Sequence, residues 1–164
     1  MNALAMFRAR SSVRKFTDEP VSRESLELMV DCARLAPTAM GLQTWEFVVI
    51  TNAVSRKCLA DALEYGKFVA QAPAVIMVLC KDSKYYLGDG CTATTTLLLA
   101  ATMQGLGSCW IAADKKPFTD YLRSLVDAPM NYRVVSIVAV GYAAETPVHS
   151  NKRTLHEVIH WEKF

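Results

Sequence analysis

The chain has 164 residues, of which 52% are hydrophobic and 21% charged, and it carries a net charge of +2. This length and composition are typical of one folded domain, and the near-neutral charge without a basic run argues against a nucleic-acid-binding protein. Five widely spaced cysteines without a C-x-x-C pair are expected to be reduced thiols. With no signal-peptide pattern at the N-terminus, we expect a cytoplasmic protein.

A basic turn, Arg10-Ser-Ser-Val-Arg14, follows a short amphipathic segment at 3–9. Arginine offers planar pairs of donors that match phosphate oxygens, and serine adds a short donor. The turn is therefore a candidate phosphate cradle. A solvated basic turn explains the same residues, and from the residues alone it is the more ordinary interpretation.

A helix is predicted from the N-cap Ser22 to about Leu35, with apolar residues at helical spacing. Pro37 follows its end, and residues 38–44 form a loop of small and polar residues. Such a loop lets the backbone approach a flat ligand closely. Trp45, which follows the loop, is by itself more often a core residue than a site residue.

Four apolar segments rich in β-branched residues predict strands at 46–50, 74–80, 108–113 and 134–140. Further helices are predicted at 52–65, at 89–104 and after Pro117. This alternation favours a layered α/β or α+β sandwich with the sheet between helices. Neither G-x-G-x-x-G after a strand nor G-x-x-x-x-G-K-[ST] occurs, so a Rossmann or P-loop site is not supported.

The chain is uncharged from Gly90 to Ala113, which is long enough to cross a bilayer. Five threonines, Gln104 and the Gly105-Leu-Gly107 break argue against a membrane span, and no cationic cluster flanks it. We expect instead a helix whose N-terminus is capped by Asp89, followed by the strand at 108–113. A helix with so little charge must be buried on nearly all sides, which predicts a central helix that two subunits could share.

The last segment, 142–164, has few core signals, so we expect an arm of the same domain (1–141) that lies across a partner subunit. It contains His156-Glu-Val-Ile-His160, a match to the zinc motif H-E-x-x-H. Only residues 161–164 remain to supply a third ligand, and the spacing of His149 does not make it one. We therefore expect no metal, and a surface helix that packs Val158, Ile159 and Trp161.

Five segments in the correct order resemble the FMN-dependent nitroreductase family, and together they cover nearly the whole chain. They are Arg10-Ser-Ser-Val-Arg-Lys-Phe16 (family Arg-Arg-Ser-Val-Arg-x-Phe), Pro20-Val-x-x-Glu24, Ala36-Pro-Thr-Ala-Met-Gly-Leu-Gln-Thr-Trp-Glu-Phe47 (family Ala-Pro-Ser-Ala-x-Asn-x-Gln-Pro-Trp-x-Phe), Asp89 with the helix up to Gly105-Leu-Gly-Ser-Cys-Trp-Ile111, and Lys152-Arg153 with His160-Trp-Glu162.

The resemblance implies an α+β fold, an α/β/α sandwich with a central and mostly antiparallel sheet, built as an intertwined homodimer with two FMN molecules at its interface. The resemblance also makes a phosphate cradle, in place of a solvated turn, the preferred interpretation of the basic turn at 10–14. Site residues fall in three implied groups. The first group, which would hold the FMN phosphate and ribityl chain, is Arg10, Ser12, Arg14 and Arg153, with Ser11 adjoining. The second, which would line the flavin ring from the other subunit, is Pro37, Thr38, Ala39, Gly41 and Gln43. The third is the backbone around Ile111 and Ala112, which would lie at the flavin edge, with Trp110 adjoining.

The sequence departs from the family pattern at Gly41, where the family often has Asn, at Thr44, where it has Pro, and at Ser11, where it has a second Arg. The short chain also leaves no room for an extra helical lid. The implied activity is hydride transfer from NADH or NADPH through flavin N5 to a nitroaromatic, a quinone or a similar small acceptor. The cofactor carries this chemistry, so no protein acid or base is expected.

Two alternatives stay open at this stage. One is a flavin-binding or redox-sensing protein with little turnover. The other is a specialised relative such as a reductive dehalogenase or a flavin-consuming enzyme, which would normally carry a substrate lid.

Overall fold

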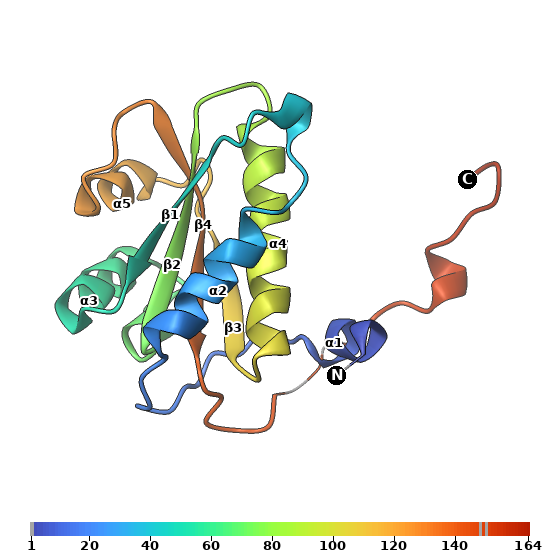
Figure 1. Cartoon of the computed structure of the whole chain (residues 1–164), viewed down its shortest axis with the longest axis horizontal. Helices are drawn as coiled ribbons and strands as arrows, with labels where there is room; N and C mark the ends of the chain where they lie inside the picture. The colour runs from blue at the N-terminus through green and yellow to red at the C-terminus, as the bar shows by residue number, and fades with distance from the viewer. Residues whose placement is uncertain (1, 148, 150) are drawn as a thin grey trace.

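The computed structural model describes residues 2–147, 149 and 151–164. Its centre is one sheet of four strands in the order β1-β2-β4-β3, in which every neighbouring pair is antiparallel (Figure 1). The predicted strands and the antiparallel sheet are thereby confirmed, with ends shifted by one or two residues. The strands are β1 (Trp45–Ile50), β2 (Ala74–Lys81), β3 (Gly107–Ala112) and β4 (Tyr132–Gly141).

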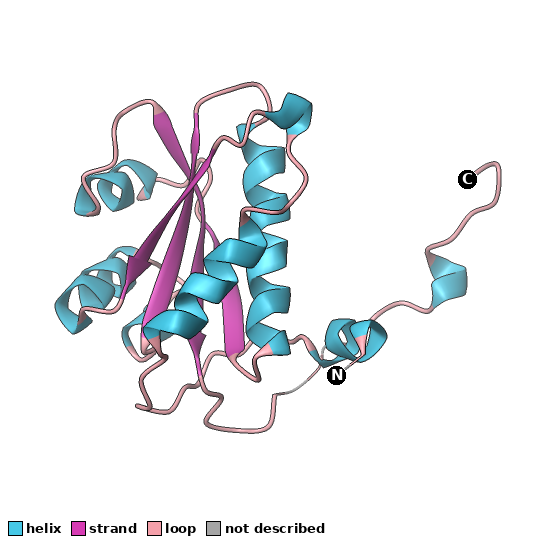
Figure 2. Ribbon diagram, viewed as in Figure 1, coloured by secondary structure: helices cyan, strands magenta, loops and turns pink. Residues whose placement is uncertain are grey.

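Helices cover both faces of this sheet, as the sandwich architecture requires (Figure 2). On one face lie α2 (Arg23–Ala33) and the long α4 (Tyr86–Met103). On the other lie α3 (Ala53–Ala62) and α5 (Thr119–Leu125). The N-terminal α1 (Ala3–Ala9) lies beside the end of α4 that leads into β3 (Figure 1).

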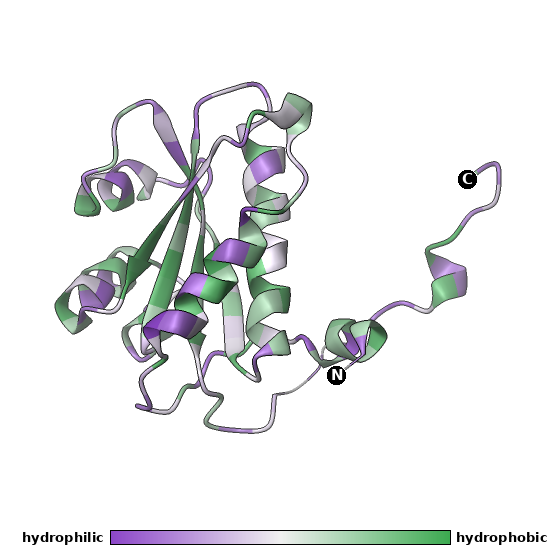
Figure 3. Cartoon of the chain, viewed as in Figure 1, coloured by the Kyte–Doolittle hydropathy of each residue, from purple (hydrophilic) through white to green (hydrophobic). Residues whose placement is uncertain are grey.

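The two core layers follow from the two-residue period of a strand. In β2, Val75 and Met77 pack into the layer under α3 and α5, whereas Ile76 and Val78 pack into the layer under α2 and α4. Because both faces are covered, β2 is buried from Ala74 to Cys80 and reads as a continuous apolar run (Figure 3).

The helix predicted at 52–65 ends at Ala62 instead. The next residue, Leu63, adopts an extended conformation and is only 1% exposed, so the chain leaves the helix in order to bury this side chain. Gly66 and a short 3₁₀ turn, Lys67–Ala70, then carry the chain into β2.

In the single chain the central helix α4 is not buried on all sides, and its sharing between two subunits stays a prediction. Thr92, Leu99 and Thr102 are half-buried, Thr95 is exposed and Met103 is 50% exposed. These partly exposed residues form an uncharged stripe along α4. The hydroxyls of Thr95, Thr96 and Thr102 donate to carbonyls of the preceding turn, so the polar groups of the stripe are satisfied. No helix among the described residues is long and apolar enough to cross a membrane.

After β4 the chain first stays on its own body. Residues 142–144 run antiparallel to 15–17, through hydrogen bonds between Thr17 and Tyr142 and between Ala144 and Lys15, and Lys15 pairs with Glu145 at 2.8 Å. Residues 151–164 lie away from the sandwich and project past α1 (Figure 1).

The surface helix predicted around His156–Trp161 is wrong. The structure has a single 3₁₀ turn, Leu155–Glu157, closed by a capping box between Thr154 and Glu157. Trp161 is 80% exposed, and a short isolated helix without a packing partner is unstable in water. The two histidines are therefore not held one helical turn apart, as H-E-x-x-H zinc binding requires.

Candidate functional site

A cationic hollow of about 500 Å³ lies between α1 and the basic turn that follows it. No carboxylate lines it, and within the described ranges none of its arginines or its lysine forms an ion pair. Free guanidinium groups and hydroxyls of this kind form a donor set that fits a phosphate. The lining residues are Phe7, Arg8, Arg10, Ser11, Ser12, Arg14, His149 and Lys152.

The basic turn is positioned by β3. Ser12 forms a parallel bridge with Ser108, and the Val13 amide donates to the Ser108 carbonyl at 3.0 Å. A Cβ at Gly107 would lie 2.8 Å from a methyl carbon of Val13, so only glycine permits this close approach. The N-terminal turn and the start of β3 therefore form one unit.

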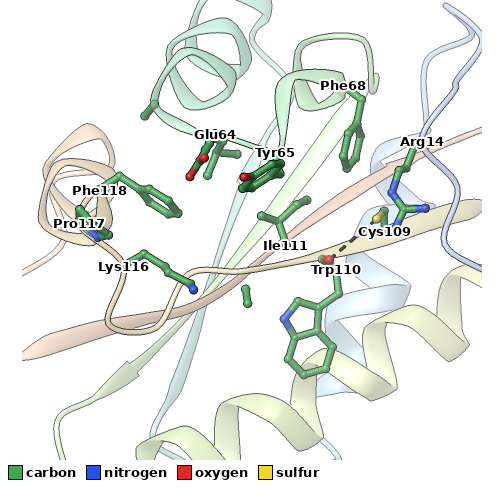
Figure 4. A pocket seen from close by; sticks show the side chains of 13 residues that line it. Arg14, Glu64, Tyr65, Phe68, Cys109, Trp110, Ile111, Lys116, Pro117 and Phe118 are labelled. Carbon is green, nitrogen blue, oxygen red and sulfur yellow. Dashed lines mark hydrogen bonds between the residues drawn. The ribbon is translucent and has the colours of Figure 1, made fainter.

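A second cavity, of about 810 Å³, continues from this turn along the other half of β3 (Figure 4). Arg14 lines both cavities, so they lie next to each other on either side of this residue. Ile111 and Ala112 line the cavity beside it. Three aromatic side chains from two parts of the chain also line it: Tyr65 and Phe68 from one segment, and Phe118 from another. A flat ring is the natural occupant of such walls.

The alternation of β3 decides which side chains face this cavity. Ile111 and Cys109 lie on the cavity side, whereas the indole of Trp110 extends to the opposite side of the strand, toward α4 (Figure 4). Burial raises the pKa of the Cys109 thiol, with Arg14 acting in the opposite direction. This thiol is therefore protonated at neutral pH and is not a nucleophile.

The loop at 37–44 lies at the other end of α4 and is held by one buried carboxylate, that of Asp89 (3% exposed). Asp89 accepts hydrogen bonds from the Thr38 hydroxyl (2.8 Å), the Ala39 amide (3.0 Å) and the Thr44 hydroxyl (3.0 Å). The prediction that Asp89 caps its own helix is therefore wrong, because α4 begins earlier, at Tyr86, and the carboxylate turns to the loop. Thr44, one of the departures from the family pattern, supplies a donor that proline lacks.

The loop backbone is unusual between these anchors. Met40, Gly41 and Gln43 have φ values of 53°, 68° and 47°, in the left-handed region. An added Cβ at Gly41 would meet nothing within 4 Å, so the position is open in space and restricted only by its φ. Met40 is 82% exposed at the tip.

The structure thus brings together only part of the predicted site. Arg10 and Ser12 line the cationic hollow, Ile111 and Ala112 line the neighbouring cavity, and Arg14 lines both. The predicted ring-lining group does not join them in the same chain; it consists of Pro37, Thr38, Ala39, Gly41 and Gln43. This group lies at one end of α4 and the basic turn at the other, and the 18-residue helix is about 27 Å long at a rise of about 1.5 Å per residue.

Arg153 does not line either cavity, and its guanidinium donates to the Glu157 carbonyl at 3.5 Å instead. Sequence reasoning missed its neighbour Lys152, which lines the cationic hollow. It also missed Tyr65, Phe68 and Phe118, for which the only available signal was a pair of aromatics on either side of Gly66.

Comparison with known proteins agrees with this geometry. The nitroreductase family model matches residues 7–86 and 60–142. A protein of Archaeoglobus fulgidus, provisionally named NADH dehydrogenase/NAD(P)H nitroreductase, is 33% identical over 98% of each chain.

Solved structures show the same relationship. An FMN-dependent nitroreductase of Clostridium difficile R20291 superposes with a TM-score of 0.92 at 27% identity, covering 98% of this chain and 99% of its own. A Bacteroides thetaiotaomicron protein with the same provisional name as the archaeal relative gives 0.90 at 31% identity, over 100% of this chain and 99% of its own. A family model that matches most of the sequence, with relatives of this identity over their full length, means that the chain belongs to the nitroreductase family.

Proposed function

We propose that the protein is an FMN-dependent oxidoreductase that uses NADH or NADPH to reduce a nitroaromatic, a quinone or a similar small acceptor. The observation that carries this proposal is a pair of cavities that share Arg14 as a lining residue, one rich in cations and free of carboxylates, the other with aromatic walls. A phosphate joined to a flat ring matches that arrangement. The names of the Clostridium and Archaeoglobus relatives support FMN and NAD(P)H as the cofactors.

Each residue group has one task in this proposal. Arg10, Ser12 and Arg14 hold the phosphate, and the backbone of Ile111 and Ala112 lines the ring. When bound, FMN would supply the hydride-transfer chemistry between the nicotinamide and the acceptor. The protein orients the ring, excludes water and places cationic and N–H groups where negative charge develops. No side chain acts as an acid or a base.

We further propose that a homodimer completes the site, with the loop at 37–43 of one subunit lining the ring held by the other. The half-exposed stripe of α4 supports this, because it is uncharged and its hydroxyls are already satisfied. A small, uncharged helix face suits close packing against a second copy. In this assembly 1–141 remains one domain, in the cytoplasm.

The arm supports the same assembly. Leu155, Val158, Trp161 and Phe164 are all exposed in the single chain. The outer edge of β1 has no neighbouring strand among the described residues, so its N–H and C=O groups are open to an added segment. We propose that the arm of each subunit lies on the other, at this edge.

The cradle is tested by Arg10→Ala combined with Arg14→Ala. The variant should remain folded and purify colourless, because the phosphate loses two charge-assisted contacts. Arg23→Ala with Arg34→Ala is a matched control that removes two cations from exposed ion pairs on α2. Full flavin occupancy in the cradle variant would refute the assignment.

Turnover separates an enzyme from a flavin-binding or redox-sensing protein. The purified holoprotein should oxidise NADH or NADPH continuously when a nitroaromatic or a quinone is supplied. A single reduction of the bound flavin, without further nucleotide consumption, would favour the sensor.

A further inference from the structure

We propose that Arg56 is a positioning residue of the flavin site, because it holds the segment that carries two of the aromatic walls of the cavity. This wall segment, residues 63–72, joins α3 to β2 and contributes Tyr65 and Phe68 to the cavity beside β3 (Figure 4). Arg56 itself does not line that cavity. The inference rests on the proposed function, since it assigns a residue outside the cavity to the binding of the flavin ring inside it.

The wall segment has little regular structure of its own. It contains one 3₁₀ turn, Lys67–Ala70, and no strand or α-helix. Leu63 and Val69 bury its inner side in the core, whereas Tyr65 on its outer side is exposed. The two buried side chains anchor the segment, but a ring that is to meet a preformed wall requires the aromatic side to be held as well.

Arg56 supplies this constraint through three backbone carbonyls. Its guanidinium donates to the carbonyl of Ala70, at 3.0 Å, and to that of Ala72, both at the end of the wall segment. It also donates to the Thr51 carbonyl at 3.3 Å, directly after β1. The planar guanidinium can hold several acceptors in one fixed arrangement. Arg56 therefore ties the wall segment to the end of β1.

The carbonyl contacts are the polar interactions of the Arg56 side chain within the described ranges, where it forms no ion pair. Ala72 is fully buried, so the loss of Arg56 would leave its carbonyl without this donor and away from water. The wall segment would then relax. Part of the free energy of FMN binding would be needed to order its aromatic side chains again.

The test measures FMN binding to the flavin-free protein by titration. Arg56→Gln should raise the dissociation constant for FMN about ten-fold, and Arg56→Lys about three-fold, since an ammonium can retain one of the contacts. The visible spectrum of the bound flavin should also change, because it reports the surroundings of the ring. Lys57→Gln is the matched control. It removes a cation from the next position of α3, where Lys57 pairs with Asp61 at 3.0 Å, and should leave both readouts unchanged.

A second readout needs no flavin. In the flavin-free Arg56→Gln variant, hydrogen exchange should be faster at the amides of Val69 and Ala72, whose hydrogen bonds to Gly66 and Phe68 lie within the wall segment. The amides of β4 should keep their wild-type protection, which distinguishes a local release from a general loss of stability. Unchanged exchange at Val69 and Ala72 would contradict the inference.

A double-mutant cycle shows whether Arg56 acts through the aromatic walls. In a protein that already carries Tyr65→Leu and Phe68→Leu, Arg56→Gln should raise the FMN dissociation constant by no more than about two-fold, because the walls that Arg56 positions are gone. An equal effect of Arg56→Gln in both backgrounds would overturn the inference. So would wild-type affinity for FMN in both Arg56→Gln and Arg56→Lys.

The wild type separates this inference from the function on which it rests. If the wild type binds FMN and reduces a nitroaromatic with NADH or NADPH, but the Arg56 variants bind FMN as tightly, the inference fails and the proposed function stands. If the wild type neither binds FMN nor reduces the nitroaromatic, both fail.

Discussion

Two segments of this chain are expected to serve the site of the partner subunit, and they are built in opposite ways. The loop at 37–44 is tied to its own body by three hydrogen bonds to Asp89, a residue some 50 positions away in sequence. The arm at 151–164 has hydrogen bonds only to itself among the described residues, chiefly between Thr154 and Glu157.

The loop is therefore a preformed element, whereas the arm is an element that association with a second subunit would complete. The loop keeps left-handed residues such as Met40 and Gly41 in place because the Asp89 anchor determines its shape before any partner arrives. The arm carries exposed apolar residues, including Trp161, that only a second surface can bury. Losing the arm should therefore affect assembly, whereas losing the anchor should affect the stability of the body itself.

Deleting residues 151–164 should have the largest effect. The proposed dimer should dissociate at least about 100-fold more readily, since exposed aromatic anchors often dominate association, and flavin should be lost with it. Sedimentation velocity with flavin absorbance measures both. The body should keep its circular dichroism, because the Lys15–Glu145 pair is retained.

Because this deletion also removes Lys152 from the cationic hollow, Lys152→Ala is its control and should leave the dimer intact. A truncated protein that stays dimeric and yellow would contradict the role of the arm.

Asp89→Ala should have the next largest effect, lowering the free energy of unfolding of the flavin-free protein by about 3 kcal/mol, because three donors lose a buried charged acceptor. FMN should also bind more weakly. Urea unfolding and FMN titration measure the two effects. Asp31→Ala, which breaks an exposed pair with Arg34 at 2.6 Å, is the control and should cost less than about 1 kcal/mol. Equal costs for the two variants would show that Asp89 is no anchor.

Gly41 gives a smaller effect that depends on backbone conformation alone. Gly41→Val should lower the free energy of unfolding by about 1–2 kcal/mol, since a β-branched residue is strained at a φ of 68°. Gly41→Asn should cost only about 0.5 kcal/mol, because Asn tolerates the left-handed region and the space beside Gly41 is open. Urea unfolding of both variants checks the order; a reversed order would mean that the loop changes conformation.

The smallest effect concerns pH in the arm. Hydrogen bonds from the Thr154 amide and hydroxyl hold the pKa of Glu157 below its ordinary value of 4.5. A depressed pKa means that the capping box is stabilised above pH 4.5 and loses this support as the pH falls through the lowered value. The Thr154 amide resonance, followed by NMR, should shift in this acidic range. In Thr154→Val the midpoint should move toward 4.5; an unchanged midpoint would argue against the hydroxyl contact.

Local patterns in the sequence were sufficient for the sheet but not for the contacts between distant segments. The apolar runs of β2 and β4 predict their strands because both faces of each are buried. Asp89 was assigned to its own helix because nothing local indicates that a loop 50 residues earlier folds back onto it. The helix predicted around Trp161 failed for a related reason, because among the described residues nothing covers this side chain, which is 80% exposed.

The same distinction between local patterns and distant contacts applies to the candidate site. Arg10, Ser12 and Arg14 could be proposed from the sequence because they are adjacent in one short turn. The aromatic walls could not, since the segment with Tyr65 and Phe68 meets Phe118 and the basic turn only in the folded chain.

The central claim is that each site is shared by two chains, and mixed dimers test it most directly. Two variants are mixed: one carries Arg10→Ala and Arg14→Ala, and the other carries Asp89→Ala. FMN binding is measured at a concentration at which neither variant homodimer binds FMN. After random exchange of subunits, half of the dimers combine the two chains, and each of these holds one intact site, so about a quarter of the wild-type flavin binding should return. A mixture that binds no more FMN than its parents would contradict the claim.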